Sequence, residues 1–281
     1  MNRLTTDKRA QILGMLCEGM SMRATARLAG ASVITVMKLL VDAGEAAQAF
    51  HDEAVRGLNC KRLQLDEIWA FCYAKQAHVS PAQQGKLGFG DIWTWTAIDA
   101  DTKLVVSYLT GTRRHQDAEA FLWDLKSRVV SRPQITTDGL HSYFSAVEKA
   151  FGADADYAQQ IKLYSSESEG QRRYSPPKCI GTWEEVISGN PDPYYISTSY
   201  VERQNLNVRM HNRRFTRLTN AFSKKAENHA HAFALQTLHH NFARIHTTLS
   251  VTPAMEAGIS DHVSTLEEMA RLLEFKRRNA A

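Results

Sequence analysis

The sequence predicts a mixed α/β domain preceded by a small all-α unit, and three patterns indicate this. Apolar residues at helical spacing, separated by glycines, fill the first part of the chain. Strand-like apolar runs then follow in close succession, and short strands finally alternate with helical stretches. The 281 residues suffice for one sizeable core and one appended unit, at about 150 residues per domain.

Residues 1–45 have the layout of a helix-turn-helix unit with three short helices. Ser21 and Ser32 stand where they can cap the second and third helices. The third helix, predicted over 33–41, would lie in a major groove of DNA. Two side chains on it are expected to reach the DNA: Thr35 and Lys38.

Residues 46–60 are predicted to be a linker or connecting helix. The catalytic core is expected over 61–258, and a helical tail over 259–281.

The core opens with three strand-like runs, LQLDEIWAFCYA, IWTWTAIDA and LVVSYLTG, whose close spacing predicts an antiparallel meander. The elements that follow are a helix over 116–130, a strand at Ile135, a helix over 142–151 and a strand over 157–163. This order of elements is typical of an RNase H-like core, a mixed sheet with flanking helices in which the first strand is central. Residues 165–197 show no clean period and are predicted to be a long insertion or loop.

Three carboxylates stand in settings that suit the metal ligands of an enzyme acting on nucleic-acid phosphates. Asp66 interrupts an apolar strand, where an unpaired charge is costly. Asp138 follows a short strand, and Glu202 opens a helix. Any one of these acids alone would most simply be a surface residue. Together they can hold two Mg²⁺ ions roughly 4 Å apart, with Mn²⁺ able to substitute, so they are the predicted metal ligands and catalytic residues. The rival third ligands are Glu167, Glu169, Glu184 and Glu185.

A basic segment surrounds Glu202. Residues 200–225 contain a large excess of arginine and lysine over acids, which suits contact with phosphates. If residues 200–218 form one helix, its polar face presents the carboxylate together with arginines that can grip a DNA backbone. The side chains predicted to contact DNA here are Arg203, Asn205, Arg209, Arg213, Arg214 and Arg217.

Several histidines lie in the next helical stretch, which otherwise has the apolar pattern of a packing helix. They are His229, His231, His239, His240 and His246. No two of them stand three or four residues apart, so a helical zinc pair is not supported. Polar-face or DNA-proximal positions are favoured instead.

Composition narrows the class of protein. The hydrophobic content of 43% and the charged content of 23% exclude collagen-like and disordered chains. The 4 cysteines form no C-x-x-C pair, which argues against a zinc ribbon or a disulfide framework. The net charge of +4 permits nucleic acid as a partner. No apolar run approaches the roughly 20 residues of a membrane span, and the first residues lack a signal-peptide core, so a cytoplasmic, nucleoid-associated location is expected.

The motifs LDEIWAF, TTDGLHSY and YVERQNLNVRMHNRRFTRLTNAFSKK resemble the three acidic motifs of DDE transposases, most closely the IS-one group of bacterial insertion sequences. The resemblance covers roughly residues 63–258. It implies an RNase H-like core, a divalent metal, a catalytic triad of Asp66, Asp138 and Glu202, and a basic residue at Arg209. Several members of that group carry a zinc-binding segment before the helix-turn-helix unit, and this sequence lacks the cysteines for one.

The leading hypothesis is therefore a transposase that hydrolyses a phosphodiester at each element end and joins the freed 3′-hydroxyl to target DNA. Its partners would be double-stranded DNA, as terminal inverted repeats and as target. Because two ends must be held together, a homodimer or higher oligomer on DNA is predicted. The alternatives are a DNA-binding regulator or inactive relic derived from such an enzyme, and a structure-selective nuclease of the same fold.

Overall fold

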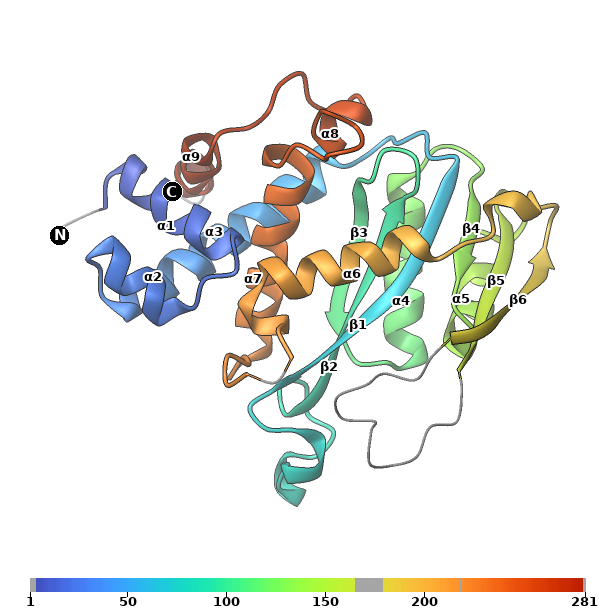
Figure 1. The fold of residues 1–281 in the computed structure, drawn as a ribbon, viewed down its shortest axis with the longest axis horizontal. Helices are drawn as coiled ribbons and strands as arrows, with labels where there is room; N and C mark the ends of the chain where they lie inside the picture. The colour runs from blue at the N-terminus through green and yellow to red at the C-terminus, as the bar shows by residue number, and fades with distance from the viewer. Residues whose placement is uncertain (1–3, 165–178, 218, 280–281) are drawn as a thin grey trace.

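The chain begins with a group of three helices. The computed structural model describes residues 4–164, 179–217 and 219–279 (Figure 1). The three helices are α1 (Thr6–Cys17), α2 (Met22–Ala29) and α3 (Val33–Ala54). Each begins at a hydroxyl side chain that accepts a hydrogen bond from a backbone N–H of the first turn, and Ser21 and Ser32 are two of these caps, as the sequence predicts.

Helix α3 extends past its predicted end through residues 46–54, so the connecting-helix alternative holds for this part of the predicted linker. Small and apolar residues on this continuation are buried, among them Ala46 and Ala47. Helix α3 contacts α7 (Ala226–Leu238) and α9 (Leu266–Asn279). Helices α3 and α7 approach so closely that a Cβ at Gly44 would lie 2.3 Å from the Cβ of His231. Packing against distant helices therefore stabilises α3 beyond the residue at which local sequence signals predict its end.

A six-stranded mixed sheet forms the centre of the molecule, so the fold is mixed α/β. The strands are β1 (Arg62–Cys72), β2 (Gly90–Asp99), β3 (Val105–Gly111), β4 (Gln134–Thr137), β5 (Asp156–Tyr164) and β6 (Cys179–Ser188). Their order is β3-β2-β1-β4-β5-β6. The first three strands are antiparallel, β4 and β5 run parallel to β1, and β6 returns antiparallel to β5. This arrangement, with β1 inside the sheet, is consistent with the predicted RNase H-like core.

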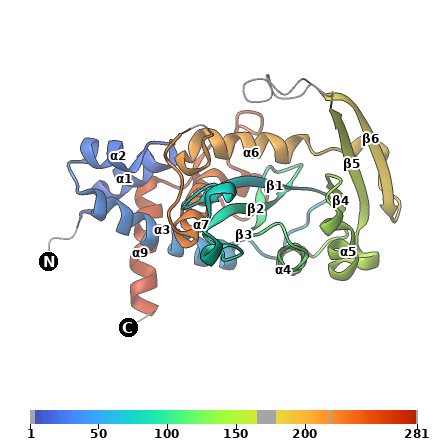
Figure 2. The same ribbon diagram turned by 90° about the horizontal axis from the view of Figure 1, so that it is seen from below.

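Helices cover both faces of the sheet. Figure 2 shows α4 (His115–Arg128) and α5 (His141–Ala150) on one face and α6 (Ser199–His211) on the other. Under α4 and α5, the ring of Trp95 lies 6.0 Å from Phe121 and 5.3 Å from Tyr143. These fully buried aromatic side chains fix the sheet to its helices.

The C-terminal residues lie against the N-terminal helices. A π-helical turn (His239–Ala243) follows α7, and the short α8 (Pro253–Glu256) precedes α9. Helix α9 contacts α1 and α3, burying Met269, Ala270 and Leu273. The predicted helical tail is therefore helical and packs beside the N-terminal unit (Figure 1).

Two predictions about elements need correction. The helix predicted over 200–218 is wrong at its end, because α6 ends at His211. The Asn212 side chain donates to the Ala232 carbonyl (3.0 Å), and this contact to α7 takes the chain out of the helix. Of the predicted insertion at 165–197, residues 165–178 lie outside the described residues, and much of the rest forms the regular edge strand β6.

In the described part of the chain, no single helix is long and apolar enough to cross a membrane; α2 and α3 pass that test only as a pair bent by 110°.

Candidate metal centre and its surroundings

Asp66 and Asp138 come together through the parallel pairing of two strands. Asp66 lies within β1, and Asp138 directly follows β4. Gln64 of β1 is the partner of Thr136 of β4. Asp66 and Asp138 each follow two residues later, so the same register sets the two carboxylates beside one another where β4 ends.

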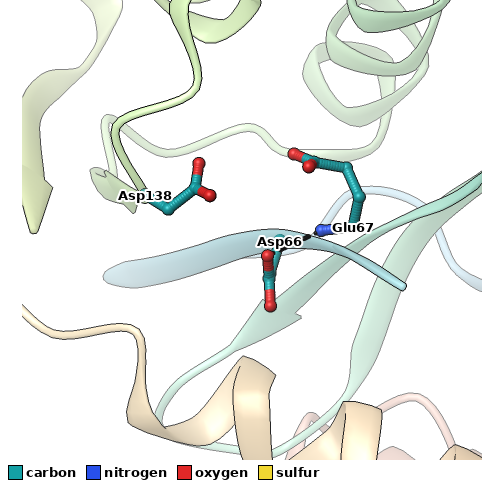
Figure 3. A group of neighbouring side chains, drawn as sticks. All are labelled: Asp66, Glu67 and Asp138. Atoms are coloured by element: carbon teal, nitrogen blue, oxygen red, sulfur yellow. Dashed lines mark hydrogen bonds between the residues drawn. The ribbon is translucent and has the colours of Figure 1, made fainter. Parts of the chain in front are cut away.

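A third acid, Glu67, joins them. Asp66, Glu67 and Asp138 each offer a carboxylate oxygen, and these oxygens lie within 4.8 Å of one another. Figure 3 shows that the carboxylates of Asp66 and Glu67 leave β1 on opposite sides, as adjacent residues of a strand must. Asp138 directly follows β4, which ends at Thr137. We call these three residues the acidic cluster.

Hydrogen bonds orient the carboxylates of Asp66 and Asp138. Asp66 accepts from the backbone N–H of Glu67 and from Nδ2 of Asn205 on α6, both at 2.8 Å. Asp138 accepts from the backbone N–H of Leu140 at 2.9 Å. The position of Asn205, which the sequence suggested for DNA contact, is thus that of a residue that orients Asp66.

The electrostatics of the acidic cluster favour a bound cation. Burial, and then the charges of Glu67 and Asp138, raise the pKa of Asp66 to about 7. Burial and the charge of Asp138 likewise raise the pKa of Glu67 to about 7. Burial also raises the pKa of Asp138. Negative charge is concentrated here beyond what the protein neutralises.

Arg113 is the cation nearest to the acidic cluster among the described ion pairs. Its guanidinium lies 3.1 Å from Oε2 of Glu67 and 3.9 Å from Oδ2 of Asp138. The same group stands over the ring of Trp93, 4.5 Å from its centroid. Glu67 also faces the buried hydroxyl of Tyr143, and the hydrogen bond between them lowers the pKa of the Glu67 carboxyl.

Glu202, the predicted third acid, lies outside this group of oxygens. Its carboxylate pairs with the ammonium of Lys162 on β5 and accepts from the Thr198 hydroxyl at 2.6 Å. Its charge still reaches the cluster, since it raises the pKa values of Asp66 and Asp138. Of the rival ligands, Glu184 and Glu185 are exposed on β6. Glu167 and Glu169 lie outside the described residues.

The arginines predicted to contact DNA divide into two groups. Arg209 is half-buried and donates to the carbonyls of Phe215 (3.2 Å) and Trp69 (3.4 Å), and burial lowers its pKa to about 10. Arg214 donates to the Ser223 hydroxyl at 2.9 Å. These two guanidinium groups brace the segment that follows α6. The exposed members are Arg203, Arg213 and Arg217.

The two predicted contacts on α3 are placed differently. Lys38 is exposed. Thr35 lies in the first turn, where its N–H and its hydroxyl both bond to the capping Ser32 hydroxyl, at 3.0 and 2.8 Å.

Two of the histidines predicted on polar or DNA-proximal faces are instead buried. His229 is fully buried, with its ring 4.2 Å from that of Phe215. His240 is also buried, and its Nε2 donates to the Lys103 carbonyl at 3.1 Å. Helix α7, which carries His229, is a packing helix, as its apolar pattern predicts, and His240 lies in the π-helical turn that follows it.

Sequence reasoning missed Glu67, Arg113 and Lys162. A signal existed for Glu67, because it is a second acid inside the same apolar strand, LQLDEIWAF, and its burial carries the same energetic cost as that of Asp66. No comparable sequence signal marks Arg113 or Lys162, whose contacts depend on the packing of distant segments.

The acidic cluster fits a divalent metal. The oxygens that coordinate one Mg²⁺ are at most about 4.2 Å apart, since each bond is about 2.1 Å long. The three carboxylates fall within 4.8 Å, so small side-chain rotations bring them into range. Hard oxygen ligands of this kind suit Mg²⁺ or Mn²⁺.

Comparison with known proteins finds similarity among solved structures. No protein-family model matches the chain, and no curated protein matches it in sequence. Among solved structures, it is similar to a chain described as "Cryo-EM structure of piggyBac transposase synaptic complex with hairpin DNA (SNHP)". The similarity covers 99% of this chain and 73% of that chain, with 10% sequence identity and a TM-score of 0.40. A similarity this distant assigns neither an activity nor a site residue.

Proposed function

We propose that this protein is a DNA transposase of the DDE type that cleaves the ends of a mobile element and joins the freed 3′-hydroxyl to target DNA. The observation that carries the proposal is the acidic cluster, in which neighbouring strands bring Asp66, Glu67 and Asp138 within 4.8 Å. All three acids lie in motifs that resemble those of DDE transposases of the IS-one group, and Asp66 and Asp138 occupy the positions of that family's catalytic acids by this resemblance. Neither support depends on the distant structural similarity.

The chain's own residues would perform three tasks. Asp66, Glu67 and Asp138 would hold the metal, and Glu202 would complete a second metal position once Lys162 releases it. Two Mg²⁺ ions in such sites supply activation of the attacking oxygen and stabilisation of the leaving oxygen. Asn205 would keep Asp66 in the orientation that binds metal, through its 2.8 Å hydrogen bond.

DNA binding would come from exposed cations and from the N-terminal helices. Arg203, Arg213 and Arg217 are exposed on and beyond α6 and would contact backbone phosphates. Lys38 on α3 would reach DNA from the helix-turn-helix unit. Because two element ends have to be joined, the active species would be a homodimer or a higher oligomer on DNA. Sedimentation that shows only a monomer on paired ends would contradict this part of the proposal.

The test is strand transfer between labelled end DNA, taken from the flanks of the reading frame, and a plasmid in Mg²⁺. Asp138→Ala is the inactive comparison, and Glu185→Gln on exposed β6 is the matched control. We expect joined products with the native chain and with Glu185→Gln, and none with Asp138→Ala.

Two other outcomes would replace the proposal. Cleavage without joining would indicate a structure-selective nuclease. DNA binding without either reaction would indicate a regulator or an inactive relic.

A further inference from the structure

A basic cavity lies on the side of α6 away from the acidic cluster. Tyr200, Arg203, Asn207 and His211 are spaced along one stripe of the helix, at about 100° per residue. All four line a cavity of about 430 Å³. Glu202, Asn205 and Arg209 project roughly opposite. One helix, about 10–12 Å across, therefore separates this cavity from the acidic cluster.

Other parts of the chain bring further cations to this cavity. Lys103, from the turn between β2 and β3, and Arg244, beyond the π-helical turn, both line it. The Lys103 ammonium stands 3.4 Å from the centroid of the Tyr200 ring. Within the described ranges, no carboxylate lines the cavity and none forms an ion pair with Lys103, Arg203 or Arg244. We call this site the basic cavity.

Hydrogen-bonding groups accompany these charges. The hydroxyl-bearing Thr247 and Thr248 line the basic cavity, as do Gln236 and His246. Oε1 of Gln236 and Nδ1 of His246 are buried without a hydrogen-bond partner in the part of the chain that the structure describes. Buried polar atoms are normally paired, so these two mark unsatisfied hydrogen-bonding capacity beside the basic cavity.

The histidines around the basic cavity show that its positive charge is not balanced. Burial lowers the pKa values of His211, His239, His240 and His246, and the charge of Arg244 lowers each of them further. Glu18 at the end of α1, whose Oε2 lies 3.5 Å from Nδ1 of His211, acts in the opposite direction on His211 and His239, as Asp99 does on Lys103. An anion would relieve this repulsion, whereas a cation would increase it.

We infer that the basic cavity binds the phosphate group of a nucleotide. Arginine and lysine side chains without carboxylate partners are the usual ligands of phosphate, and the volume leaves room for part of the attached nucleoside. A DNA strand and a free nucleotide both carry this group. If DNA is the source, the inference deepens the proposed function and rests on it: a strand whose scissile phosphate lies at the acidic cluster would cross α6 and place another phosphate in the basic cavity.

The experiment uses the full chain in EDTA, so that binding is measured without metal-dependent chemistry. The probes are inorganic phosphate, a deoxynucleoside 5′-monophosphate, and a short single strand of DNA. Imidazole resonances of histidine-labelled protein report where each probe binds. His51 and His229 are buried away from the basic cavity and serve as internal references.

We expect phosphate and nucleotide to move the resonances of His211, His239, His240 and His246 while the two references stay in place. Arg203→Gln combined with Arg244→Gln should weaken nucleotide binding by about tenfold or more. Both arginines are exposed, so the variant should fold normally. Lys86→Gln, which removes an exposed charge elsewhere, is the matched control. Unmoved histidine resonances, or a double variant that binds like Lys86→Gln, would overturn the inference.

Competition identifies the source of the phosphate. A single strand that displaces the nucleotide from the basic cavity would support the DNA source. Displacement by free nucleotides alone would support a separate nucleotide site. Asp138→Ala should bind the nucleotide as the native chain does. Strand transfer tests the proposed function and phosphate binding by the arginine variant tests this inference, so the failure of one can be told from the failure of the other.

Discussion

The two sides of α6 carry opposite kinds of unbalanced charge. On one side, Asp66, Glu67 and Asp138 are fixed on or beside strands, and burial raises their pKa values. On the other side, Arg203 and Arg244 are exposed, and the neighbouring histidines have lowered pKa values. Under the two proposals, the acidic side therefore binds a cation and the basic side an anion.

The two sides of α6 contribute side chains to two different places in the molecule. Residues that point into the sheet, such as Asn205, act on the acidic cluster through direct hydrogen bonds. Residues on the opposite stripe, such as Arg203 and His211, line the basic cavity. Substitutions on α6 should therefore separate into two classes, according to the side that they alter.

The largest effect should come from the acidic cluster itself. We predict that Asp66→Asn lowers metal-dependent DNA cleavage by about 10³-fold or more, and Glu67→Gln by about 10²-fold, because both supply ligand oxygens. DNA binding in EDTA should stay within about twofold of the native value. Single-turnover cleavage and fluorescence anisotropy measure the two quantities. Native activity in Glu67→Gln would show that Glu67 is not a metal ligand.

The acidic cluster should make the metal-free protein less stable as the pH rises. The pKa of Asp66 is about 7 in the folded chain and 3.8 as its ordinary value. Between these values the folded state binds more protons than the unfolded state, so stability falls as the pH rises through this window. The loss due to Asp66 alone is at most about 4 kcal/mol. Urea unfolding in EDTA from pH 4 to pH 8 measures the total loss, and Asp66→Asn should make it smaller, while Glu67 still contributes; an unchanged slope would contradict the assignment.

The basic side should respond to pH with the opposite sign. Burial lowers the pKa of His240 to about 4, from an ordinary value of 6.5. As the pH falls through this range, His240 becomes protonated in the unfolded chain but stays neutral in the folded chain. Stability is therefore lost on acidification, by at most about 3 kcal/mol. Unfolding of His240→Gln between pH 7 and pH 4 should show a smaller loss than the native chain. An equal loss would mean that groups other than His240 cause the loss of stability.

Arginines of the same basic segment should differ in their effects. Arg209→Gln breaks two hydrogen bonds to carbonyls, so we expect a loss of about 1–2 kcal/mol in stability. Arg217→Gln removes an exposed charge, so it should leave stability unchanged and reduce the salt dependence of DNA binding by about one phosphate contact. Thermal unfolding and salt-dependent anisotropy separate the two. If Arg209→Gln instead reduced the salt dependence of DNA binding and Arg217→Gln reduced stability, Arg209 would be the residue that contacts the DNA backbone.

The smallest effect should come from the ion pair of Glu202. Lys162→Met frees the Glu202 carboxylate, and we predict about threefold tighter Mn²⁺ binding by calorimetry, the scale of a partly exposed ion pair. Lys162→Arg keeps the pair and is the control. Unchanged affinity in Lys162→Met would mean that Glu202 is not a ligand.

The sequence predicts most of the sheet because its patterns are local. The alternation in IWTWTAIDA and the short run before Asp138 place β2 and β4 within a few residues of their observed bounds. Parallel pairing of β4 with β1 follows from the order of elements, and it is enough to set Asp66 beside Asp138.

The remainder depends on contacts between distant segments. The apolar positions Phe215 and Leu218 continue the helical period, yet α6 ends because Asn212 bonds to α7. Adjacent residues of a strand face opposite sides, so the local pattern does not predict that Asp66 and Glu67 both lie near Asp138. The Lys162 pair with Glu202 joins residues 40 positions apart and leaves no local pattern.

The most direct test of the central claim is to locate Mn²⁺ by anomalous diffraction in crystals grown with that ion. We predict a peak within bonding distance of Asp66, Glu67 and Asp138, and its disappearance in Asp138→Ala. Activity supported by Mn²⁺ in a protein whose bound ion lies away from these three carboxylates would contradict it.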